Sequence, residues 1–337
     1  MSTRIKPFST TGIGSLPHRN AVDACELVFA TFDIPFWPQL PNISFKESMI
    51  AQYSEGMPFI KVDEQRQVIS VSRDDSDELE RFYETCSETA RISISEDYGH
   101  GLHAFLKMLK GRRLPLLKGH VTGPVTFTLG LKDHNGRLVF FDEELREIAA
   151  MLLKAKMRWQ IDALKQHAVE VIIFIDEPIL SALGSSSYLG VDAGEAFRLI
   201  KDMASAINDA GAISGVHCCG RADWPMVMES GAQIINFDAF DYFDTLAIYH
   251  EQLSKFLRGG GYLAWGIIPT SDAIEKVDDR QLIELMHSHL DELCKYLPAS
   301  LVQERILITP SCGAATRSVG ETIKICQLLM HMKEAMV

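Results

Sequence analysis

A histidine and two cysteines stand together in the segment G-V-H-C-C-G, residues 215–220. The short apolar run before them, Ala212–Val216, is typical of a buried β-strand. Side chains alternate between the two faces of a strand, so His217 and Cys219 face one way and Cys218 faces the other. An imidazole and a thiolate on one face are two good ligands for zinc. The segment therefore predicts one half of a zinc site, and the other ligands must come from elsewhere in the chain.

The bulk composition limits the class of protein. The chain has 337 residues and a formal net charge of -12, which argues against a general nucleic-acid binder. No apolar run reaches the roughly 20 residues of a membrane span, and the polar start has no apolar signal core. Seven cysteines, an odd number spread over a long chain, do not form the pattern of a disulfide framework. We expect a cytoplasmic protein that binds neither nucleic acid nor a membrane.

Short apolar runs alternate with longer helical patterns along the chain. The first run ends in residues 10–17, and the seven others span 36–40, 114–122, 170–175, 212–216, 233–237, 261–268 and 306–309. The predicted helices span 20–31, 141–166, 193–210, 245–257, 280–297 and 319–336. Eight such units predict an α/β fold, a (β/α)8 TIM barrel. A doubly wound open sheet is the alternative, but its G-x-G-x-x-G turn is missing after the first run.

One long segment, about residues 57–110, interrupts this rhythm between the second and third strands. Residues 58–62 and 67–71 are predicted to form a hairpin, and residues 77–110 are predicted to be mostly helical. We interpret the segment as an insertion between strands 2 and 3 that covers the mouth of the barrel. Because no Pro-, Gly- or Ser-rich linker divides the chain, we expect a single domain over residues 1–337.

Polar residues recur at the ends of the predicted strands. In barrels of this kind the active site lies at the carboxyl ends of the strands. The residues found there are Ser15, Asp176, Glu177, His217, Cys219, Asp238 and Cys312. Polar residues placed by chance would not all lie at the carboxyl ends of the strands. Their common position therefore predicts a functional site. His120 also ends a strand and could line the pocket, but we favour the interpretation of a core histidine whose ring is hydrogen bonded.

Each of these residues also has a structural interpretation. Asp176 precedes a proline-containing turn, and Asp238 precedes a helix, so both are typical of caps. Ser15 fits a turn beside Pro17, and a lone Cys312 fits a buried thiol. The H-x-C pattern by itself is weak. The residues point to a site only when they are taken together.

Three ligands of N, S and S type leave one position open for a substrate, which is the pattern of a catalytic zinc. A thiolate-rich zinc binds a substrate thiol and deprotonates it near neutral pH. Such a thiolate can attack an activated methyl group. A hydrolytic zinc is the competing interpretation, but hydrolytic sites use mostly His and carboxylate ligands, so two cysteines favour alkylation of a thiol.

The chain resembles the C-terminal catalytic barrel of the cobalamin-independent methionine synthase family, within the uroporphyrinogen decarboxylase/methionine synthase-like superfamily. The stretches that carry the resemblance, in the family's order, are I-G-S-L-P (13–17), T-G-P-V-T (122–126), I-D-E-P-I-L (175–180), H-C-C (217–219) and P-S-C-G-A-A-T-R (310–317). The combination is specific, and it covers almost the whole chain. We expect the catalytic half alone, without the family's additional N-terminal barrel.

The resemblance implies that His217, Cys219 and Cys312 are zinc ligands. The family's glutamate ligand falls at or near Asp238, whose side chain is one methylene shorter. Zn2+ is therefore the cofactor that we expect, with Asp238 as a second-rank ligand.

The resemblance also implies a site for an amino-acid substrate. Ile13, Gly14 and Ser15 would hold the substrate carboxylate, and Asp176 would bind the amino group as part of the catalytic machinery. The family has a second acidic partner for the amino group, and Glu47 is the nearest candidate here.

Two departures from the family bear on the methyl donor. A tryptophan that stacks on folate is missing, and Gly130 stands near its place. A histidine that protonates the departing folate is also missing, and Gly266 stands near that position. A folate amine needs protonation to leave, whereas a methyl–cobalt bond does not.

The sequence therefore predicts a zinc-dependent methyltransferase that acts on a thiol, with homocysteine converted to methionine. The preferred donor is a methylcorrinoid, carried by a corrinoid protein or supplied as a free methylcobamide, rather than methyl-tetrahydrofolate. Two alternatives stay open. One is a corrinoid-linked methyltransferase with another thiol acceptor, and the other is a non-catalytic zinc-binding barrel.

Overall fold

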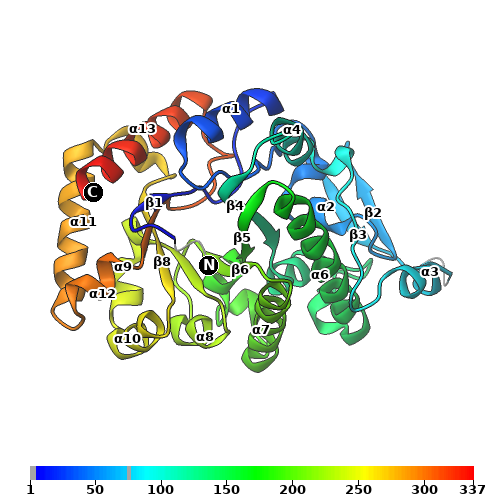
Figure 1. Ribbon diagram of the computed structural model, residues 1–337. Helices are drawn as coiled ribbons and strands as arrows, with labels where there is room; N and C mark the ends of the chain where they lie inside the picture. The colour runs from blue at the N-terminus through cyan, green and yellow to red at the C-terminus, as the bar shows by residue number, and fades with distance from the viewer. Residues whose placement is uncertain (1–4, 74–76) are drawn as a thin grey trace.

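The computed structural model describes residues 5–73 and 77–337 and contains a curled parallel sheet surrounded by helices (Figure 1). Seven strands form this sheet in the order β1-β9-β8-β7-β6-β5-β4. Their bounds are β1 Ser9–Thr10, β4 Leu114–Thr122, β5 Ala168–Asp176, β6 Ile213–Cys218, β7 Ile234–Asp238, β8 Tyr262–Ile268 and β9 Ile306–Pro310. The order follows the chain from β4 to β9 and does not reverse as in a doubly wound sheet. The fold is therefore α/β with a sequentially ordered parallel sheet.

The predicted second strand, residues 36–40, is not a regular strand. An extended segment does lie between β1 and β4, and it makes only isolated bridges, Phe36 with Lys118 and Gln39 with Ser15. Pro35 and Pro38 cannot donate backbone hydrogen bonds, which explains why no continuous ladder forms. The prediction of eight regular strands was wrong in this respect.

The first strand is also shorter than the sequence indicated. Only Ser9 and Thr10 pair with β9, and residues 11–17 form a loop at the carboxyl end of the sheet. The loop packs closely on β4 at Gly14, because a Cβ at this position would lie only 2.7 Å from the His120 ring. Only glycine fits there without displacing the ring. The run that was predicted as strand therefore supplies a loop above the sheet.

Most of the predicted helices are present within one to three residues of their expected ends. The structure places them at α1 Ala21–Thr31, α6 Glu143–Lys165, α7 Ala193–Asp209, α11 Asp279–Cys294 and α13 Val319–Met336. Side chains cap their first turns; the Ser318 hydroxyl, for example, accepts from the Glu321 N–H in a capping box at the start of α13. The predicted helix over 245–257 is wrong. It is divided into α9 Ala239–Ala247 and α10 His250–Arg258, because Tyr249 leaves the helical conformation with ψ 43°.

Shorter helices were not predicted. They are α2 Met49–Ser54, α5 Pro124–Gly130, α8 Trp224–Glu229 and α12 Ala299–Gln303, with single 3-10 turns at η1 Phe45–Glu47, η2 Glu96–Tyr98, η3 Val139–Phe141, η4 Pro178–Ala182, η5 Ser186–Tyr188 and η6 Asp272–Glu275. Helices of one or two turns carry too little periodic pattern to be recognised in a sequence.

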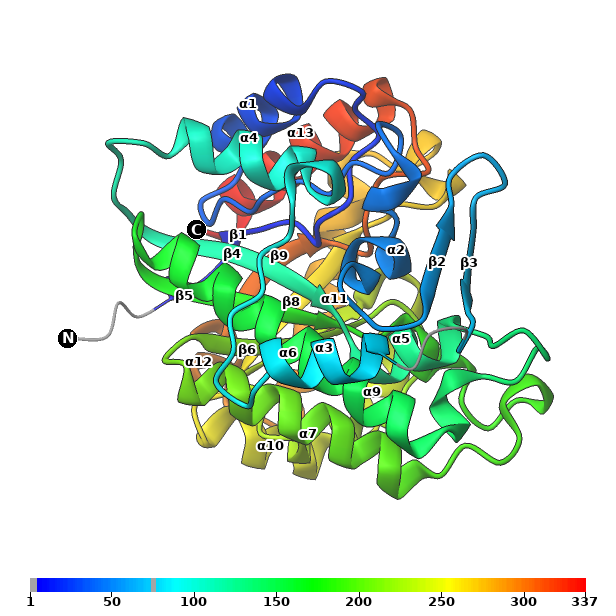
Figure 2. The same ribbon diagram turned by 90° about the vertical axis from the view of Figure 1, so that its right-hand side faces the viewer.

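The insertion contains the predicted hairpin, in which β2 Ile60–Asp63 pairs antiparallel with β3 Val68–Val71. Helices α3 Asp77–Thr85 and α4 His100–Met108 follow, but residues 86–95 have no regular structure, so the mostly helical prediction was right only in part. Figure 2 shows the hairpin on the side toward which the strands of the sheet point. Residues 74–76 of the insertion lie outside the described part of the chain.

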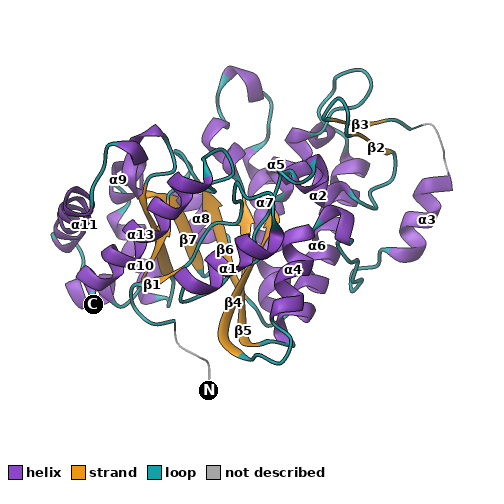
Figure 3. Cartoon of the chain, turned by 90° about the horizontal axis from the view of Figure 1, so that it is seen from above, coloured by secondary structure: helices purple, strands orange, loops and turns teal. Residues whose placement is uncertain are grey.

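Two apolar clusters fill the space on either side of the sheet. Figure 3 shows the helices arranged around the strands. A small inner cluster contains Ile172 and Phe174 of β5, and the large outer cluster contains Ile173 and Ile175 together with residues of the helices. This alternation continues to the end of the strand, so Asp176 belongs to the inner row. The inner face thus changes from apolar to polar at the carboxyl end. Among the described residues, no helix combines the length and apolarity needed to cross a membrane.

Candidate metal centre

Three neighbouring strands place polar side chains in one row at this end of the sheet. His217 of β6 pairs in register with Asp176 of β5 on one side and with Asn236 of β7 on the other. Paired residues at one level of a parallel sheet present their side chains to the same face, so the three groups are neighbours. Cys219 follows two residues after His217 and faces the same way.

The structure brings His217, Cys219 and Cys312 together, although Cys312 lies 95 residues away from His217 in sequence. Their ligand atoms lie within 4.8 Å of one another, and Cys312 Sγ is 3.7 Å from His217 Nε2. Zn–N and Zn–S bonds of ordinary length in a tetrahedron place N and S about 3.6 Å apart. The donor types and this spacing fit a zinc ion with one position left for another ligand.

Asn236 fixes the histidine ring in the orientation that a metal ligand needs. Its Nδ2 donates to the carbonyl of Ala264 and to Oγ1 of Thr309, both at 2.8 Å. Its Oδ1 must then be the acceptor for Nδ1–H of His217. This assigns the tautomer whose Nε2 lone pair faces the cysteines. Sequence reasoning missed Asn236, although an asparagine inside the apolar run I-I-N-F was a signal.

The two cysteines have opposite acidities. A hydrogen bond from Cys312, together with the neighbouring His217, lowers the pKa of Cys219 to about 4 against the effect of burial. The same hydrogen bond and burial raise the pKa of Cys312 well above its usual range. The two shifts run in opposite directions, so Cys219 is the more acidic thiol of the pair and the more readily available thiolate ligand.

Cys218 lies apart from this group, as alternation predicts. It is fully buried in the large outer apolar cluster, and burial raises its pKa to about 12. Its thiol is 3.9 Å from the carbonyl oxygen of Gly220. Cys218 is a core residue.

Asp238 is buried near the group, but the metal-ligand group found in the described part of the chain includes no carboxylate. Its Oδ1 accepts from the Asp241 N–H at 3.0 Å and so caps the start of α9. Burial raises its pKa to about 6. Its place as a fourth ligand stays a prediction.

Asp176 is buried, and its Oδ1 has no hydrogen-bond partner among the described residues. Burial raises its pKa to about 6, while the neighbouring His217 and Lys118 oppose that rise. Lys118 is fully buried in β4 and donates to the Ile13 carbonyl at 2.6 Å. Burial lowers the pKa of Lys118 to about 7. Asp176 Oδ1 is thus open to a polar partner that the described residues do not supply.

The loop over Ile13–Ser15 presents unused donors near the cysteines. In the described structure the backbone N–H groups of Ile13, Gly14 and Ser15 donate to no protein acceptor. Ser15 Oγ lies close to Gly313, the neighbour of Cys312, since a Cβ at Gly313 would be only 2.1 Å from it. A run of free N–H groups is suited to an anion such as a carboxylate.

Glu47 is not in this group of open polar atoms. Its side chain is fully buried, Oε2 accepts from the Leu40 N–H at 3.0 Å, and Oε1 accepts from the N–H of His100 at 2.7 Å. The imidazole of His100 is also 2.7 Å from Oε1. These bonds tie the extended segment 34–40 to the start of α4, so the structure gives Glu47 a role in holding the fold.

Glu177, beside Asp176, also has a structural task. Its carboxylate accepts from the N–H groups of Val125 at 2.9 Å and Thr126 at 2.7 Å, and from the Thr126 hydroxyl at 2.6 Å. It therefore caps α5. This contact joins the T-G-P-V-T and D-E-P stretches.

The two glycines that depart from the family pattern differ in their surroundings. A Cβ at Gly266 would lie 2.5 Å from the carbonyl oxygen of Phe237, so the backbone leaves no space for a side chain there. Gly130 is exposed, and a Cβ there would meet only the Ile50 side chain, at 2.8 Å. The absence of an imidazole at Gly266 is therefore part of the packing.

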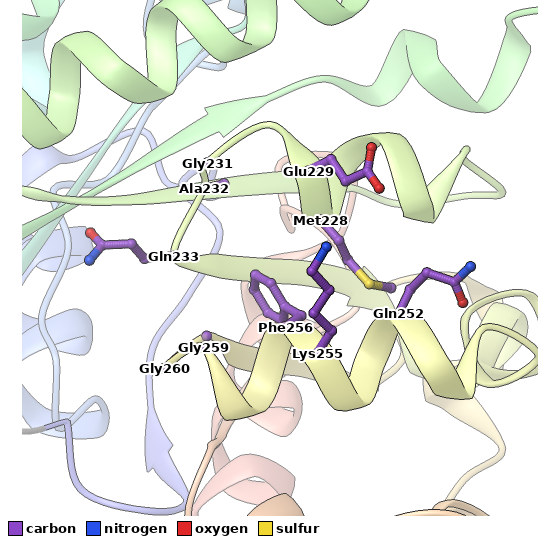
Figure 4. A pocket seen from close by; sticks show the side chains of 11 residues that line it. Met228, Glu229, Gly231, Ala232, Gln233, Gln252, Lys255, Phe256, Gly259 and Gly260 are labelled. Atoms are coloured by element: carbon purple, nitrogen blue, oxygen red, sulfur yellow. The ribbon is translucent and has the colours of Figure 1, made fainter.

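A cleft of about 450 Å³ lies away from this centre, between α8 and α10 (Figure 4). Met228, Glu229, Lys255 and Phe256 contribute to its walls. The glycine-containing turns that line it precede β7 and β8, so the cleft lies at the amino ends of the strands. That end of such a fold serves stability rather than chemistry.

Comparison with known proteins supports a related fold. No protein-family model matches the chain, and no curated protein matches its sequence. A solved structure of a B12-independent methionine synthase from Shewanella sp. W3-18-1, in complex with selenomethionine, superposes with a TM-score of 0.56 at 15% identity, covering 97% of both chains. At this identity the likeness shows the fold alone.

Two further solved structures are much less similar. A 3-keto-D-glucoside 4-epimerase from E. coli has a TM-score of 0.37 at 11% identity, covering 70% of this chain and 85% of its own. A protein from Aquifex aeolicus has a TM-score of 0.28 at 11% identity, covering 77% of this chain and 97% of its own. Both TM-scores are too low to indicate a shared fold.

Zinc content tests the ligand group. We expect the purified protein to bind about one zinc ion per chain, and Cys219→Ala and Cys312→Ala to bind much less, because each removes one of three protein ligands. Metal analysis by mass spectrometry after dialysis measures this. Cys218→Ala is the matched control and should keep its zinc. Equal zinc in all four proteins would contradict the assignment.

Replacement of Asn236 tests the orientation of the histidine. Asn236→Ala should weaken zinc binding about 10- to 100-fold, because the ring loses the partner that fixes its tautomer. Competition with a chelator of known affinity measures the change. Asn236→Asp keeps an acceptor for Nδ1–H of His217, so its zinc affinity should fall less than that of Asn236→Ala. If the alanine variant holds zinc as tightly as the wild type, Asn236 has no such role.

Proposed function

We propose that this chain is a zinc-dependent methyltransferase that transfers a methyl group to the thiol of homocysteine and forms methionine. The methyl donor that we favour is a methylcorrinoid rather than methyl-tetrahydrofolate. The observation that carries the proposal is the N, S, S ligand group of His217, Cys219 and Cys312. This group lies next to Asp176, whose Oδ1 has no partner in the described structure.

The ligand group supports thiol chemistry. A zinc ion held by His217, Cys219 and Cys312 would lower the pKa of a substrate thiol and keep the sulfur as a thiolate. The protein itself fixes the imidazole through Asn236, and the neighbouring Cys312 and His217 lower the pKa of Cys219. With zinc bound, these residues would hold the nucleophilic sulfur at one place above the end of β6.

The surroundings support an amino-acid acceptor. The free N–H groups of Ile13, Gly14 and Ser15 suit a carboxylate, and the open oxygen of Asp176 suits an ammonium group. A simple thiol would leave both unsatisfied at a cost of about 1–3 kcal/mol for each buried group. The structurally similar Shewanella protein was solved with selenomethionine, an amino acid of the same class.

The packing at Gly266 favours the corrinoid donor. This position cannot carry a general acid without displacing the backbone at Phe237 and Ser311, and Gly130 offers no aromatic platform for a folate. A folate amine needs such an acid, because an unprotonated amine is a poor leaving group. Transfer from a methylcorrinoid needs none. The thiolate sulfur forms a bond to the methyl carbon, the methyl–cobalt bond breaks, and its electron pair stays on cobalt, which passes from Co(III) to Co(I).

A donor and acceptor screen tests this function. Zinc-loaded protein is supplied with homocysteine and either methylcobalamin or methyl-tetrahydrofolate, and methionine is measured by mass spectrometry. We expect methionine from methylcobalamin, and a loss of about 10- to 100-fold in kcat/KM for homocysteine in Asp176→Asn, which removes the charged partner of the amino group.

Reactions without protein and with Cys312→Ala are the controls for spontaneous transfer. No methionine from either donor would overturn the proposal, and methionine from the folate alone would overturn the choice of donor. A mercaptoethanesulfonate acceptor that reacts as fast as homocysteine would overturn the amino-acid assignment.

A further inference from the structure

His120 is a buried imidazole without hydrogen bonds to its ring. Its side chain is 1% exposed, and neither ring nitrogen has a partner among the described residues. Its backbone, by contrast, is fully used, since the N–H donates to Gln160 and the carbonyl accepts from Gln160 and Tyr53. The prediction of a hydrogen-bonded core histidine was therefore wrong. A buried polar group left open in this way needs an explanation.

The ring faces the loop of free N–H groups. A Cβ at Gly14 would lie 2.7 Å from Cε1 and 2.8 Å from Nδ1 of His120, so the polar edge of the imidazole lies under this loop. The indole of Trp37 stacks on the ring, with 3.8 Å between centroids. Trp37 in turn donates to Gln160 at 2.8 Å. The ring is thus held in place by stacking while its nitrogens stay open.

Asp176 lies on the neighbouring strand, on the same face of the sheet as His120. Asp176 pairs in register with Thr122, and His120 lies two residues before Thr122 on the same face of β4. A carboxylate and an imidazole at these positions lie on neighbouring strands within reach of one small group. Asp176 Oδ1 and the His120 nitrogens are all without partners in the described residues. One ligand with several hydrogen-bond donors would satisfy Asp176 Oδ1 and the lone-pair nitrogen of His120 together.

We propose that His120 is the second partner of the substrate's α-amino group, which Asp176 binds from β5. This inference rests on the proposed function, because it names a residue of the same amino-acid site. Glu47, the candidate indicated by sequence, already uses its oxygens for Leu40 and His100.

The chemistry of the imidazole suits this task. An ammonium group has three N–H donors and no acceptor, and a neutral imidazole offers one nitrogen lone pair. Burial, and then the positive charge of Lys118, hold the pKa of His120 well below its usual range, so the ring is an acceptor. A thiol without an amino group would leave the lone pair unsatisfied. His120 therefore helps to select an amino-acid thiol.

Binding calorimetry on zinc-loaded protein tests the inference with two ligands that differ only in the amino group, homocysteine and 4-mercaptobutyrate. His120→Phe keeps an aromatic ring against Trp37 and removes the nitrogens. We expect this variant to bind homocysteine about 10- to 100-fold more weakly, as for loss of a hydrogen bond to a charged group. Its affinity for 4-mercaptobutyrate should change less than about threefold. His120→Asn restores an acceptor and should recover part of the loss.

His289 offers a matched control outside the site. It is a buried histidine with an unpartnered Nδ1, stacked at 3.9 Å on Phe243. His289→Phe should change neither affinity. Zinc content and thermal unfolding of each variant show that the site is intact.

The outcomes separate this inference from the proposed function. Equal weakening of both ligands by His120→Phe would overturn the inference and assign His120 a structural role. An unchanged homocysteine affinity would also overturn it, while the methyltransferase proposal would stand. A wild-type protein that binds homocysteine no better than 4-mercaptobutyrate would overturn the amino-acid site itself, and the inference with it.

Discussion

The hydrogen bond between His217 and Asn236 is the interaction on which the candidate metal centre depends. It exists because parallel strands β6 and β7 pair in register and bring the two residues to one level. Asn236 of β7 is itself fixed by hydrogen bonds to Ala264 of β8 and Thr309 of β9. Three strands therefore determine the orientation of the imidazole. The ligand atom is thereby aimed at Cys219 and Cys312. A rigid sheet thus prepares the site before any ligand arrives.

Open polar atoms are concentrated at one end of the inner face. Asp176 Oδ1 and the His120 nitrogens have no partner in the described residues, and the loop Ile13–Ser15 has free N–H groups. Each buried unsatisfied group costs about 1–3 kcal/mol, which the apolar inner and outer clusters must offset. Natural proteins tolerate such groups where function requires them. Their clustering therefore supports a ligand with both an anionic and an ammonium group.

Alternation along a strand was enough to separate Cys219 from Cys218, because it depends only on the local backbone. The meeting of Cys312 with His217 was predictable from the rule that strand ends share one edge of the sheet. Asn236 was missed because its partners come from other strands. Glu47 was the nearest acidic candidate for the substrate site, but its bonds to Leu40 and His100 depend on how the insertion packs and could not be predicted from the sequence.

The fold was predictable to a similar degree. Long amphipathic helices such as α6 and α13 follow from periodicity and capping residues. The strand over residues 36–40 was predicted from its apolar composition. That prediction gave too little weight to Pro35 and Pro38, which cannot donate the backbone hydrogen bonds of a continuous ladder. The break at Tyr249 has no Gly or Pro to mark it. Local patterns thus give the order of the elements, and tertiary contacts decide where they end.

X-ray absorption at the zinc edge tests the central claim most directly. The zinc-loaded protein should show two sulfur neighbours at about 2.3 Å and at least one nitrogen at about 2.0–2.1 Å, from Cys219, Cys312 and His217. Addition of L-selenohomocysteine should place a selenium atom among the zinc neighbours, because the substrate takes the open position. Zinc surrounded by nitrogen and oxygen alone, or sulfur neighbours with no selenium after saturation, would contradict the account.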